Sequence, residues 1–187
     1  MFSHSSSPRR IAAGLYGEAV AAARAPVFYA DLAVPDTIEG RYEMIVLHVV
    51  LLLRRLRASG TAQKQKQKRL AQALVDFMAA DLDRSIRELG VGDMSVGKFM
   101  KRLGEGLFGR ASAYDGALDN NDFQALESAI LRNIFDGYEP GERILATVAR
   151  YVRAQNDHLA GQAVEPIAAG HVDFQPFADM NLGAETA

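Results

Sequence analysis

The most hydrophobic stretch of the sequence lies between Tyr42 and Arg57, and its pattern is that of a helix without a polar face. Every residue from Met44 to Leu53 is apolar except His48. At about 100° per residue, apolar side chains therefore point all the way round the helix axis. Such a helix is typical of a protein interior, and the run is shorter than the roughly 20 apolar residues that span a membrane. The pattern predicts a buried central helix.

The rest of the chain shows amphipathic patterns with a helical period, and no segment alternates with the period of a strand. We therefore predict an all-α fold, a single helical-bundle domain around the buried central helix. The domain is expected over residues 11–160, between a disordered N-terminus (1–10) and an extended C-terminal tail (161–187) lying along the surface. The surrounding helices are expected over residues 11–24, 65–89, 95–108, 122–135 and 142–159.

Capping residues, glycine and proline mark the expected ends of these helices. Asp36 or Thr37 is expected to cap the start of the central helix. Residues 27–32 are expected to form a short aromatic connector after Pro26. Residues 109–121 are expected to form a loop or a broken helix.

One acidic residue conflicts with the hydrophobic pattern. Asp81 falls on the apolar arc of the helix predicted over residues 65–89. Because a lone buried carboxylate is very costly, we expect Asp81 to be buried and paired with an Arg or Lys from another helix. Asp83 and Arg87 lie on the opposite, polar side at the spacing of a helical ion pair.

Composition and charge narrow the possible chemistry. The chain has no Cys, which excludes disulfides and thiolate chemistry, and its net charge of -2 gives no general affinity for polyanions. Residues 54–69 nevertheless hold basic side chains without any acidic one. Two interpretations are open: a solvated loop between two helices, or contact with an anionic membrane or a ribosomal surface. The residues assigned to that contact are Arg54, Arg55, Arg57, Lys64, Lys66 and Lys68.

The sequence contains no recognisable catalytic or metal-binding motif. A calcium loop starting at Asp81 fails because Ile86 and Gly92 stand where the loop needs glycine and glutamate. The 4 histidines are scattered, and His48 is interpreted as a hydrogen-bonded core residue. We predict no catalytic residue, no metal and no cofactor.

Three segments taken together resemble one protein family. They are PDTIEGRYEMIVLHVVLLLRRL (residues 35–56), MAADLDRSIRELGVGDMSVGKFMK (78–101) and GRASAYD (109–115). They are similar to the ubiquinol–cytochrome c chaperone family in its compact α-proteobacterial form, and the similarity runs from about residue 11 to about residue 157. The resemblance gives the middle segment a signature made of Asp81, Asp83, Arg87, Gly90, Gly92, Asp93, Ser95, Gly97 and Lys98.

The resemblance implies a non-catalytic, membrane-associated chaperone. Its mitochondrial relatives are assembly factors for the cytochrome bc1 complex that bind newly made cytochrome b near the ribosomal exit tunnel, together with a small partner protein. For this chain it implies cytochrome b or another bc1 subunit as the partner, no DNA, and a cytoplasmic position peripheral to the bacterial inner membrane. The residues expected to contact the client or partner are Asp81, Asp83, Arg87, Lys98, Lys101, Arg102 and Tyr114.

The helix predicted over residues 95–108 combines an apolar stripe, a basic face and two glycines in line, Gly97 and Gly104. Glycine inside a helix costs about 1 kcal/mol relative to alanine, so two in line suggest that another backbone approaches closely. That backbone belongs either to this domain or to a client helix. In the second case the basic side chains Lys98, Lys101 and Arg102 would meet the polar ends of the client.

A second hypothesis comes from a different class, an all-α enzyme or carrier that acts on an isoprenoid or another lipophilic small molecule. Asp76, Asp81 and Asp83 are similar to the magnesium-binding carboxylates of all-α isoprenoid synthases, but no second acidic motif accompanies them. An exposed apolar groove beside basic residues would favour the chaperone. A closed apolar pocket with converging carboxylates or a metal would favour the enzyme or carrier.

Overall fold

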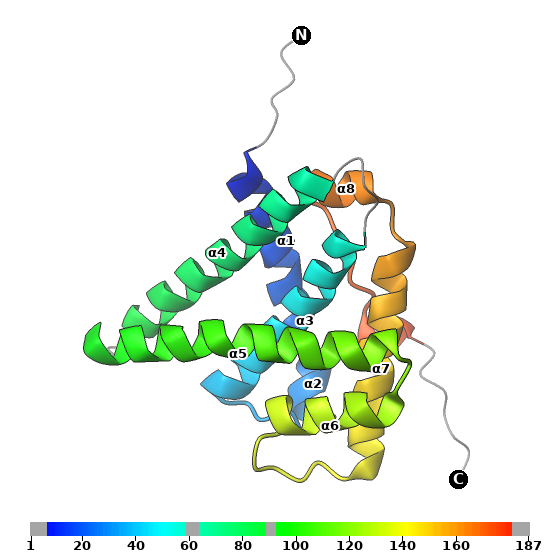
Figure 1. The fold of residues 1–187 in the computed structure, drawn as a ribbon. Coiled ribbons are helices and arrows are strands. Elements are labelled where there is room, and N and C mark those ends of the chain that lie inside the picture. The colour runs from blue at the N-terminus through cyan, green and yellow to red at the C-terminus, as the bar shows by residue number, and fades with distance from the viewer. Residues whose placement is uncertain (1–6, 59–63, 89–92, 181–187) are drawn as a thin grey trace.

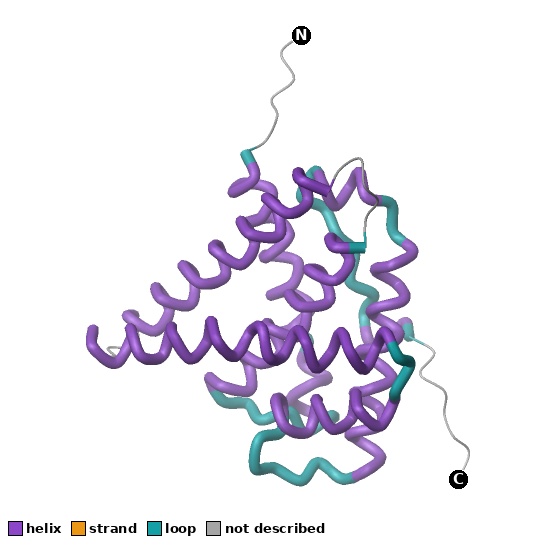
Figure 2. Tube along the Cα trace, in the orientation of Figure 1, coloured by secondary structure: helices purple, strands orange, loops and turns teal. Residues whose placement is uncertain are grey.

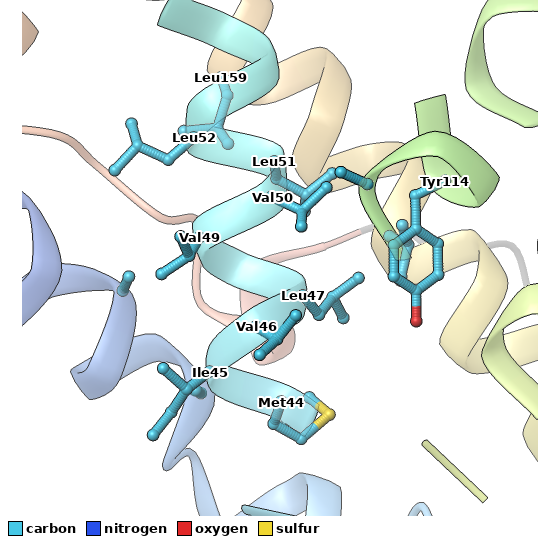
Figure 3. Close-up of a cluster of buried hydrophobic side chains, with 14 of the residues drawn as sticks. Met44, Ile45, Val46, Leu47, Val49, Val50, Leu51, Leu52, Tyr114 and Leu159 are labelled. Atoms are coloured by element: carbon cyan, nitrogen blue, oxygen red, sulfur yellow. The ribbon is translucent and has the colours of Figure 1, made fainter. Parts of the chain in front are cut away.

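The central helix α3 (Ile38–Arg57) runs through the middle of the molecule, and every residue from Met44 to Leu52 is buried. Thr37 caps its start, because its Oγ1 accepts a hydrogen bond from the Gly40 N–H at 3.0 Å. Apolar side chains leave the helix in all directions, some of them toward Tyr114 of a neighbouring helix (Figure 3). The predicted buried central helix and its cap are confirmed.

The coordinates are a computed structural model that describes residues 7–58, 64–88 and 93–180, except for the side chains of Ile86 and residues 93–105. Within these ranges the secondary structure is entirely helical (Figures 1 and 2), which confirms the all-α prediction. The elements around α3 are α1 (Pro8–Ala23), α2 (Pro26–Ala30), α4 (Lys64–Glu88), α5 (Asp93–Asp119), α6 (Phe123–Ile134), α7 (Glu142–Gly161), α8 (Val164–Ala168) and the 3₁₀ turn η2 (Phe177–Asp179).

Two N-terminal boundaries differ from those expected. Helix α1 begins at Pro8, inside the segment expected to be disordered, because Ser7 caps it and proline suits the first helical turn. Residues 1–6 of that segment lie outside the described residues. The expected aromatic connector is largely the one-turn helix α2, whose Phe28 is buried against the core.

The largest correction to the predicted elements concerns α5, which continues to Asp119 where a loop or broken helix was expected over residues 109–121. Gly109 and Gly116 lower the intrinsic helix propensity of this stretch. Burial of a stripe that contains Ala111, Tyr114 and Ala117 offsets that cost, because the stripe packs against α3 and α6.

Up to residue 180, where the description of the chain ends, the C-terminal tail contains no further long helix, as predicted, but part of it belongs to the core. Ile167 and Val172 are buried. Gln155 of α7 exchanges two hydrogen bonds with the backbone of Gln175, with N···O distances of 3.1 and 3.0 Å. These contacts hold the tail segment against α7.

Helices α4 and α5 converge at the left edge of the view in Figure 1, beyond the other helices. The N-terminal part of α4 packs on α1 and α3 through Leu70, Leu74 and Met78, which are all buried. After Met78 no described side chain of α4 is buried. The C-terminal part of α4 from Asp81, with the N-terminal half of α5, is called the α4–α5 hairpin below.

Candidate functional site

Asp81 opens the α4–α5 hairpin, and the structure corrects the prediction made for it. Its side chain is 36% exposed rather than buried. The Tyr16 hydroxyl of α1 donates to Asp81 Oδ2 at 3.1 Å, and Arg84 of the same helix lies 3.2 Å from Oδ1. The partner from another helix is therefore a tyrosine hydroxyl and not the Arg or Lys that was expected. The apolar arc of α4 is only partly covered this far along the helix, so the carboxylate keeps contact with water.

Tyr16 remains protonated in this contact. Burial is the main cause that raises its pKa above the ordinary value, and the negative charge of Asp81 adds to the effect. The Tyr16 ring also packs on Phe77 of α4, with ring centroids 5.5 Å apart. Tyr16 therefore anchors α4 to α1 at the point where the hairpin leaves the core.

Asp83 and Arg87 form the predicted helical ion pair further along the hairpin. Arg87 Nε lies 2.7 Å from Asp83 Oδ2, and Arg87 Nη2 lies 3.3 Å from Oδ1, in a two-pronged contact. Both side chains are between one third and one half exposed. A surface pair of this kind contributes little to stability.

The remaining expected client-contact residues of the hairpin lie on the first turns of α5. The side chains of Lys98, Lys101 and Arg102, together with Gly97 and Gly104, fall outside the side chains that the structure describes. Their predicted contact with a client stays a prediction.

The segment GRASAYD has a structural role at both of its ends. Arg110 binds Glu43 of α3 with both prongs of its guanidinium; its Nε lies 2.6 Å from Oε2, and its Nη2 contacts Oε1. Glu43 is only 8% exposed, so burial raises its pKa while Arg110 opposes the shift. This buried pair joins the middle of α5 to the first half of α3.

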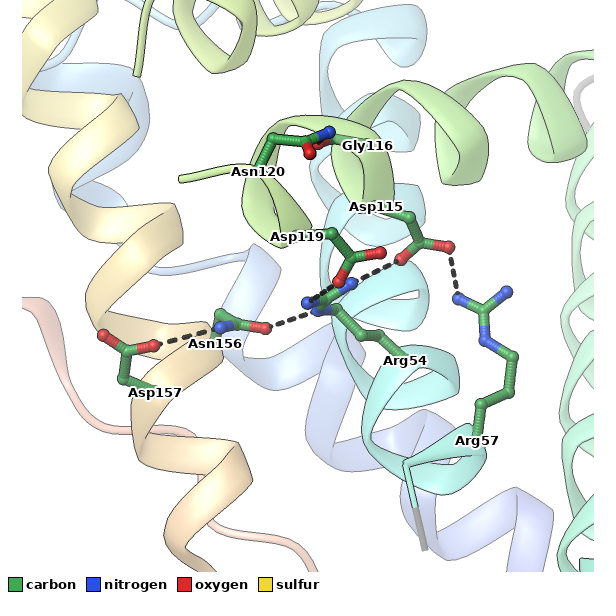
Figure 4. Close-up of polar contacts among 8 residues, drawn as sticks. All are labelled: Arg54, Arg57, Asp115, Gly116, Asp119, Asn120, Asn156 and Asp157. Atoms are coloured by element: carbon green, nitrogen blue, oxygen red, sulfur yellow. Dashed lines mark hydrogen bonds and ion pairs between the residues drawn. The ribbon is translucent and has the colours of Figure 1, made fainter. Parts of the chain in front are cut away.

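At the other end of the segment, Asp115 joins α5 to the end of α3. It lies 2.6 Å from Arg57 and 3.4 Å from Arg54 (Figure 4). Arg54 also reaches Asp119 at 2.5 Å and donates from Nε to Asn156 of α7 at 2.9 Å. One arginine therefore connects α3, α5 and α7. Its hydrogen bond to Asp119, together with its charge, holds the pKa of that carboxyl below the ordinary range.

These contacts divide the basic block of residues 54–69 into two parts. Arg54 and Arg57 have carboxylate partners within the chain, and Arg55 donates to the Gln162 carbonyl at 2.6 Å. The three arginines therefore lie on the last turn of α3 and have partners within the chain, although the Arg57 side chain is 54% exposed. The lysines of the block are exposed on the first turns of α4; they are Lys64, Lys66 and Lys68.

Among the expected contact residues whose side chains the structure describes, Tyr114 is the one that lies in the interior. It is 1% exposed, and burial raises the pKa of its phenol above the ordinary value. A partner docking on the folded chain cannot touch it, because it lies in the interface of α5 with the rest of the core (Figure 3).

His48 is a satisfied core residue, as predicted. Its Nδ1 lies 2.7 Å from the Met44 carbonyl and its Nε2 lies 2.6 Å from the Tyr151 hydroxyl. Complete burial lowers the pKa of His48 to about 4, so the ring is neutral near pH 7.

Sequence reasoning missed the pairing of Glu43 with Arg110. The available signal is Glu43 itself, a carboxylate directly before the apolar run of α3. A carboxylate in that position predicts a cation beside it.

Two further features bear on the chemistry of the molecule. Among the described residues, no group of three or more His, Cys, Asp or Glu side chains could hold a metal ion. Within the same ranges, none of the helices combines the length and the hydrophobicity needed to span a bilayer.

Comparison with known proteins gives consistent results. Residues 30–174 match the family model described as ubiquinol-cytochrome C chaperone. The chain is similar to the crystal structure of the Cbp3 homolog from Brucella abortus, with 40% identity, a TM-score of 0.79 and coverage of 91% of this chain and 92% of that one.

Curated relatives are more distant and longer. Protein CBP3, mitochondrial, of Saccharomyces cerevisiae is 29% identical over 155 residues, which are 81% of this chain and 45% of that protein. Ubiquinol-cytochrome c reductase complex assembly factor 1 of Mus musculus is 25% identical over 155 residues, covering 82% and 51% of the two chains. The chain thus spans about half the length of these relatives.

Proposed function

The chain belongs to the ubiquinol–cytochrome c chaperone family, and from this premise we propose that it is a non-catalytic chaperone that binds cytochrome b during assembly of the cytochrome bc1 complex. The observation that carries the proposal is the family match over residues 30–174. The names of the curated relatives, which are assembly factors of ubiquinol-cytochrome c reductase, support it.

We place the client contact on the α4–α5 hairpin. Two of the three segments that resemble the family serve the fold: Thr37 caps α3, and Arg110 and Asp115 pair with α3. In the middle segment, Asp83 and Arg87 form a partly exposed ion pair within one helix, and a pair of this kind contributes little to stability. Exposed charged side chains of this kind are accessible to a partner. The proposed contact residues are Asp81, Asp83, Arg87, Lys98, Lys101 and Arg102.

A peripheral position at the inner membrane fits the exposed lysines at the start of α4. Each basic residue near an anionic bilayer contributes about 1 kcal/mol, so Lys64, Lys66 and Lys68 suffice for weak, salt-sensitive binding. Arg54, Arg55 and Arg57 are engaged by partners within the chain and contribute less. Flotation with anionic and neutral liposomes, at low and high salt, tests this contact; equal recovery with both lipids contradicts it.

The decisive experiment is affinity purification of the full chain from bacterial membranes with and without expression of cytochrome b. Recovery of cytochrome b, and loss of other bc1 subunits from the eluate when it is absent, supports the proposal. A strain without the chaperone should accumulate less assembled bc1 complex at unchanged cytochrome b transcript. Normal assembly in that strain, with no cytochrome b captured, contradicts the proposed function.

A further inference from the structure

A cleft of about 500 Å³ lies between the first turns of α3 and the end of α6, on a part of the molecule distinct from the α4–α5 hairpin. The Glu43–Arg110 pair from α3 and α5 lines it. Its volume falls in the range of sites that bind small molecules or short peptide segments.

Two buried polar atoms in the lining of this cleft have no hydrogen-bond partner. They are the Tyr42 hydroxyl and the Asn133 Nδ2, and Tyr42 as a whole is 6% exposed. An unsatisfied buried polar group costs about 1–3 kcal/mol, and native proteins leave few of them. Both groups can donate a hydrogen bond, and the Tyr42 hydroxyl can also accept one, so an acceptor is the kind of partner that would satisfy both atoms.

The charges around the cleft nearly cancel. Arg110 is neutralised by Glu43, and the remaining charged lining residues are Glu39, Asp136 and Arg132. Such a lining selects neither a phosphate nor a metal cation. An uncharged acceptor, of which the peptide carbonyl is the commonest, fits the donors better.

An exposed aromatic side chain borders the same cleft. Among the described residues the large hydrophobic side chains that stand exposed are Ile38, Phe108 and Tyr138. Of these three, Tyr138 lines the cleft, and it is 55% exposed. An aromatic side chain beside a polar base is typical of protein-binding surfaces.

We propose that this cleft binds an extended, uncharged segment of a partner polypeptide, whose carbonyl groups accept hydrogen bonds from Tyr42 and Asn133 and whose apolar side chains pack on Tyr138. A small shift of the side chains that cover the two donors accompanies binding, since neither atom is open to water in the free cleft. The identification of the segment as part of cytochrome b rests on the proposed function.

The test uses the purified full chain and an array of end-capped peptides, each about 15 residues long, that together cover the sequence of cytochrome b. Tyr42→Phe removes only the unpartnered hydroxyl, so it should leave Tm unchanged or raised and weaken peptide binding about 3- to 10-fold. Tyr151→Phe is the matched control for stability, because its hydroxyl is bonded to His48 and its loss should lower Tm.

Tyr138→Ala should weaken binding about 10-fold without changing Tm, since the ring is exposed. Phe108→Ala is the matched control, because it removes an aromatic ring that is more exposed than that of Tyr138. Phe108 lies two residues before Arg110 on α5, so its side chain leaves the helix about 200° away from that of Arg110. Binding should survive that change. The same peptides with a free C-terminal carboxylate should bind no better than the capped ones.

Three results would contradict the cleft proposal or the proposed function. A fall in Tm for Tyr42→Phe as large as that for Tyr151→Phe means that the hydroxyl has a structural partner, and the cleft proposal is then wrong. The cleft proposal also fails if wild-type protein captures cytochrome b but all four variants bind the array equally. If wild-type protein neither captures cytochrome b nor binds any peptide, the proposed function fails as well.

Discussion

The packed block formed by α3 and the C-terminal half of α5 contrasts with the α4–α5 hairpin. In the block, charged residues reach across helices: Arg110 to Glu43, and Asp115 to Arg54 and Arg57. In the hairpin, Asp83 pairs with a residue one turn away on its own helix. Residues of the first kind are explained by folding. Residues of the second kind contribute little to stability, and the proposed client contact lies among them.

The largest expected effect comes from breaking the buried pair of the block. Arg110→Ala leaves Glu43 buried without a cation, and we expect a loss of about 3–5 kcal/mol in the free energy of unfolding. Urea denaturation measures it. Part of the loss should return as the pH is lowered toward 5, because burial favours the protonated form of Glu43.

Glu43→Leu combined with Arg110→Leu is the control for this effect. Removing both charges leaves no stranded group, so the double variant should be more stable than Arg110→Ala. Equal destabilisation by the single and double changes would mean that the pair acts through its shape and not through its charge.

The core of the block should also be sensitive to acid through His48. Its folded-state pKa of about 4 lies below the unfolded value of about 6.5. Between these values the unfolded chain binds the proton and the folded chain does not. The stabilisation is therefore complete above pH 6.5 and is lost as the pH falls, by about 3 kcal/mol at pH 4.

The measurement is the pH dependence of unfolding free energy for wild-type protein and for His48→Gln. The wild-type curve should be steeper between pH 6.5 and 4, since only it carries the buried imidazole. A titration of the His48 imidazole itself near pH 6.5 in the folded protein, observed by NMR with assigned histidine signals, would contradict the burial argument.

Two glycines also distinguish the packed block from open surface, and replacing them should have smaller effects on stability. A Cβ at Gly40 would overlap the Pro35 carbonyl oxygen, which is backbone and cannot move freely. Gly40→Ala should therefore lower stability by about 1–3 kcal/mol. Gly116→Ala is the control: nothing lies within 4 Å of that Cβ, so the helix should gain up to about 1 kcal/mol. Thermal melting of both variants checks the two signs.

Asp81 stands at the boundary between the two regions, and its expected effect is correspondingly intermediate. Asp81→Ala removes the acceptor of the Tyr16 hydroxyl, but the site is partly open to water. We expect a loss of about 1 kcal/mol, well below that of Arg110→Ala. Asp81→Asn keeps an acceptor and should melt close to the wild type. A loss near 4 kcal/mol for Asp81→Ala would contradict this account of a carboxylate that keeps contact with water.

The sequence was most informative where local physics decides the structure. The unbroken apolar run of α3 and the Thr37 cap required only period and capping rules. The continuous α5 did not follow from them, because Gly109 and Gly116 weaken the helix locally and only burial against α3 and α6 compensates.

The candidate site shows the same limit. Asp81 was placed correctly on the apolar arc, yet the arc extends beyond the residues that cover it, and only tertiary structure shows where cover ends. Tyr114 was assigned to a partner surface because the family segment contains it, although its ring fills the core. Resemblance marks which residues matter to a family; packing separates those that serve the fold from those left for a partner.

The smallest effect on stability should accompany the largest effect on function, and it is expected at Asp83 and Arg87. Removing an exposed i, i+4 pair costs about 0.3–0.5 kcal/mol, so Asp83→Ala with Arg87→Ala should melt within a degree or two of wild type. Under the proposed function, the same variant should lose capture of cytochrome b.

The exchanged variant, Asp83→Arg with Arg87→Asp, keeps an ion pair but reverses its direction on the helix. If it captures cytochrome b normally, the pair acts only by orienting the helix surface and touches no client. If it fails to capture while melting normally, the direction of the charges is what the client reads. Wild-type capture by the double alanine variant would move the client surface away from this part of the hairpin, to the basic face of Lys98, Lys101 and Arg102.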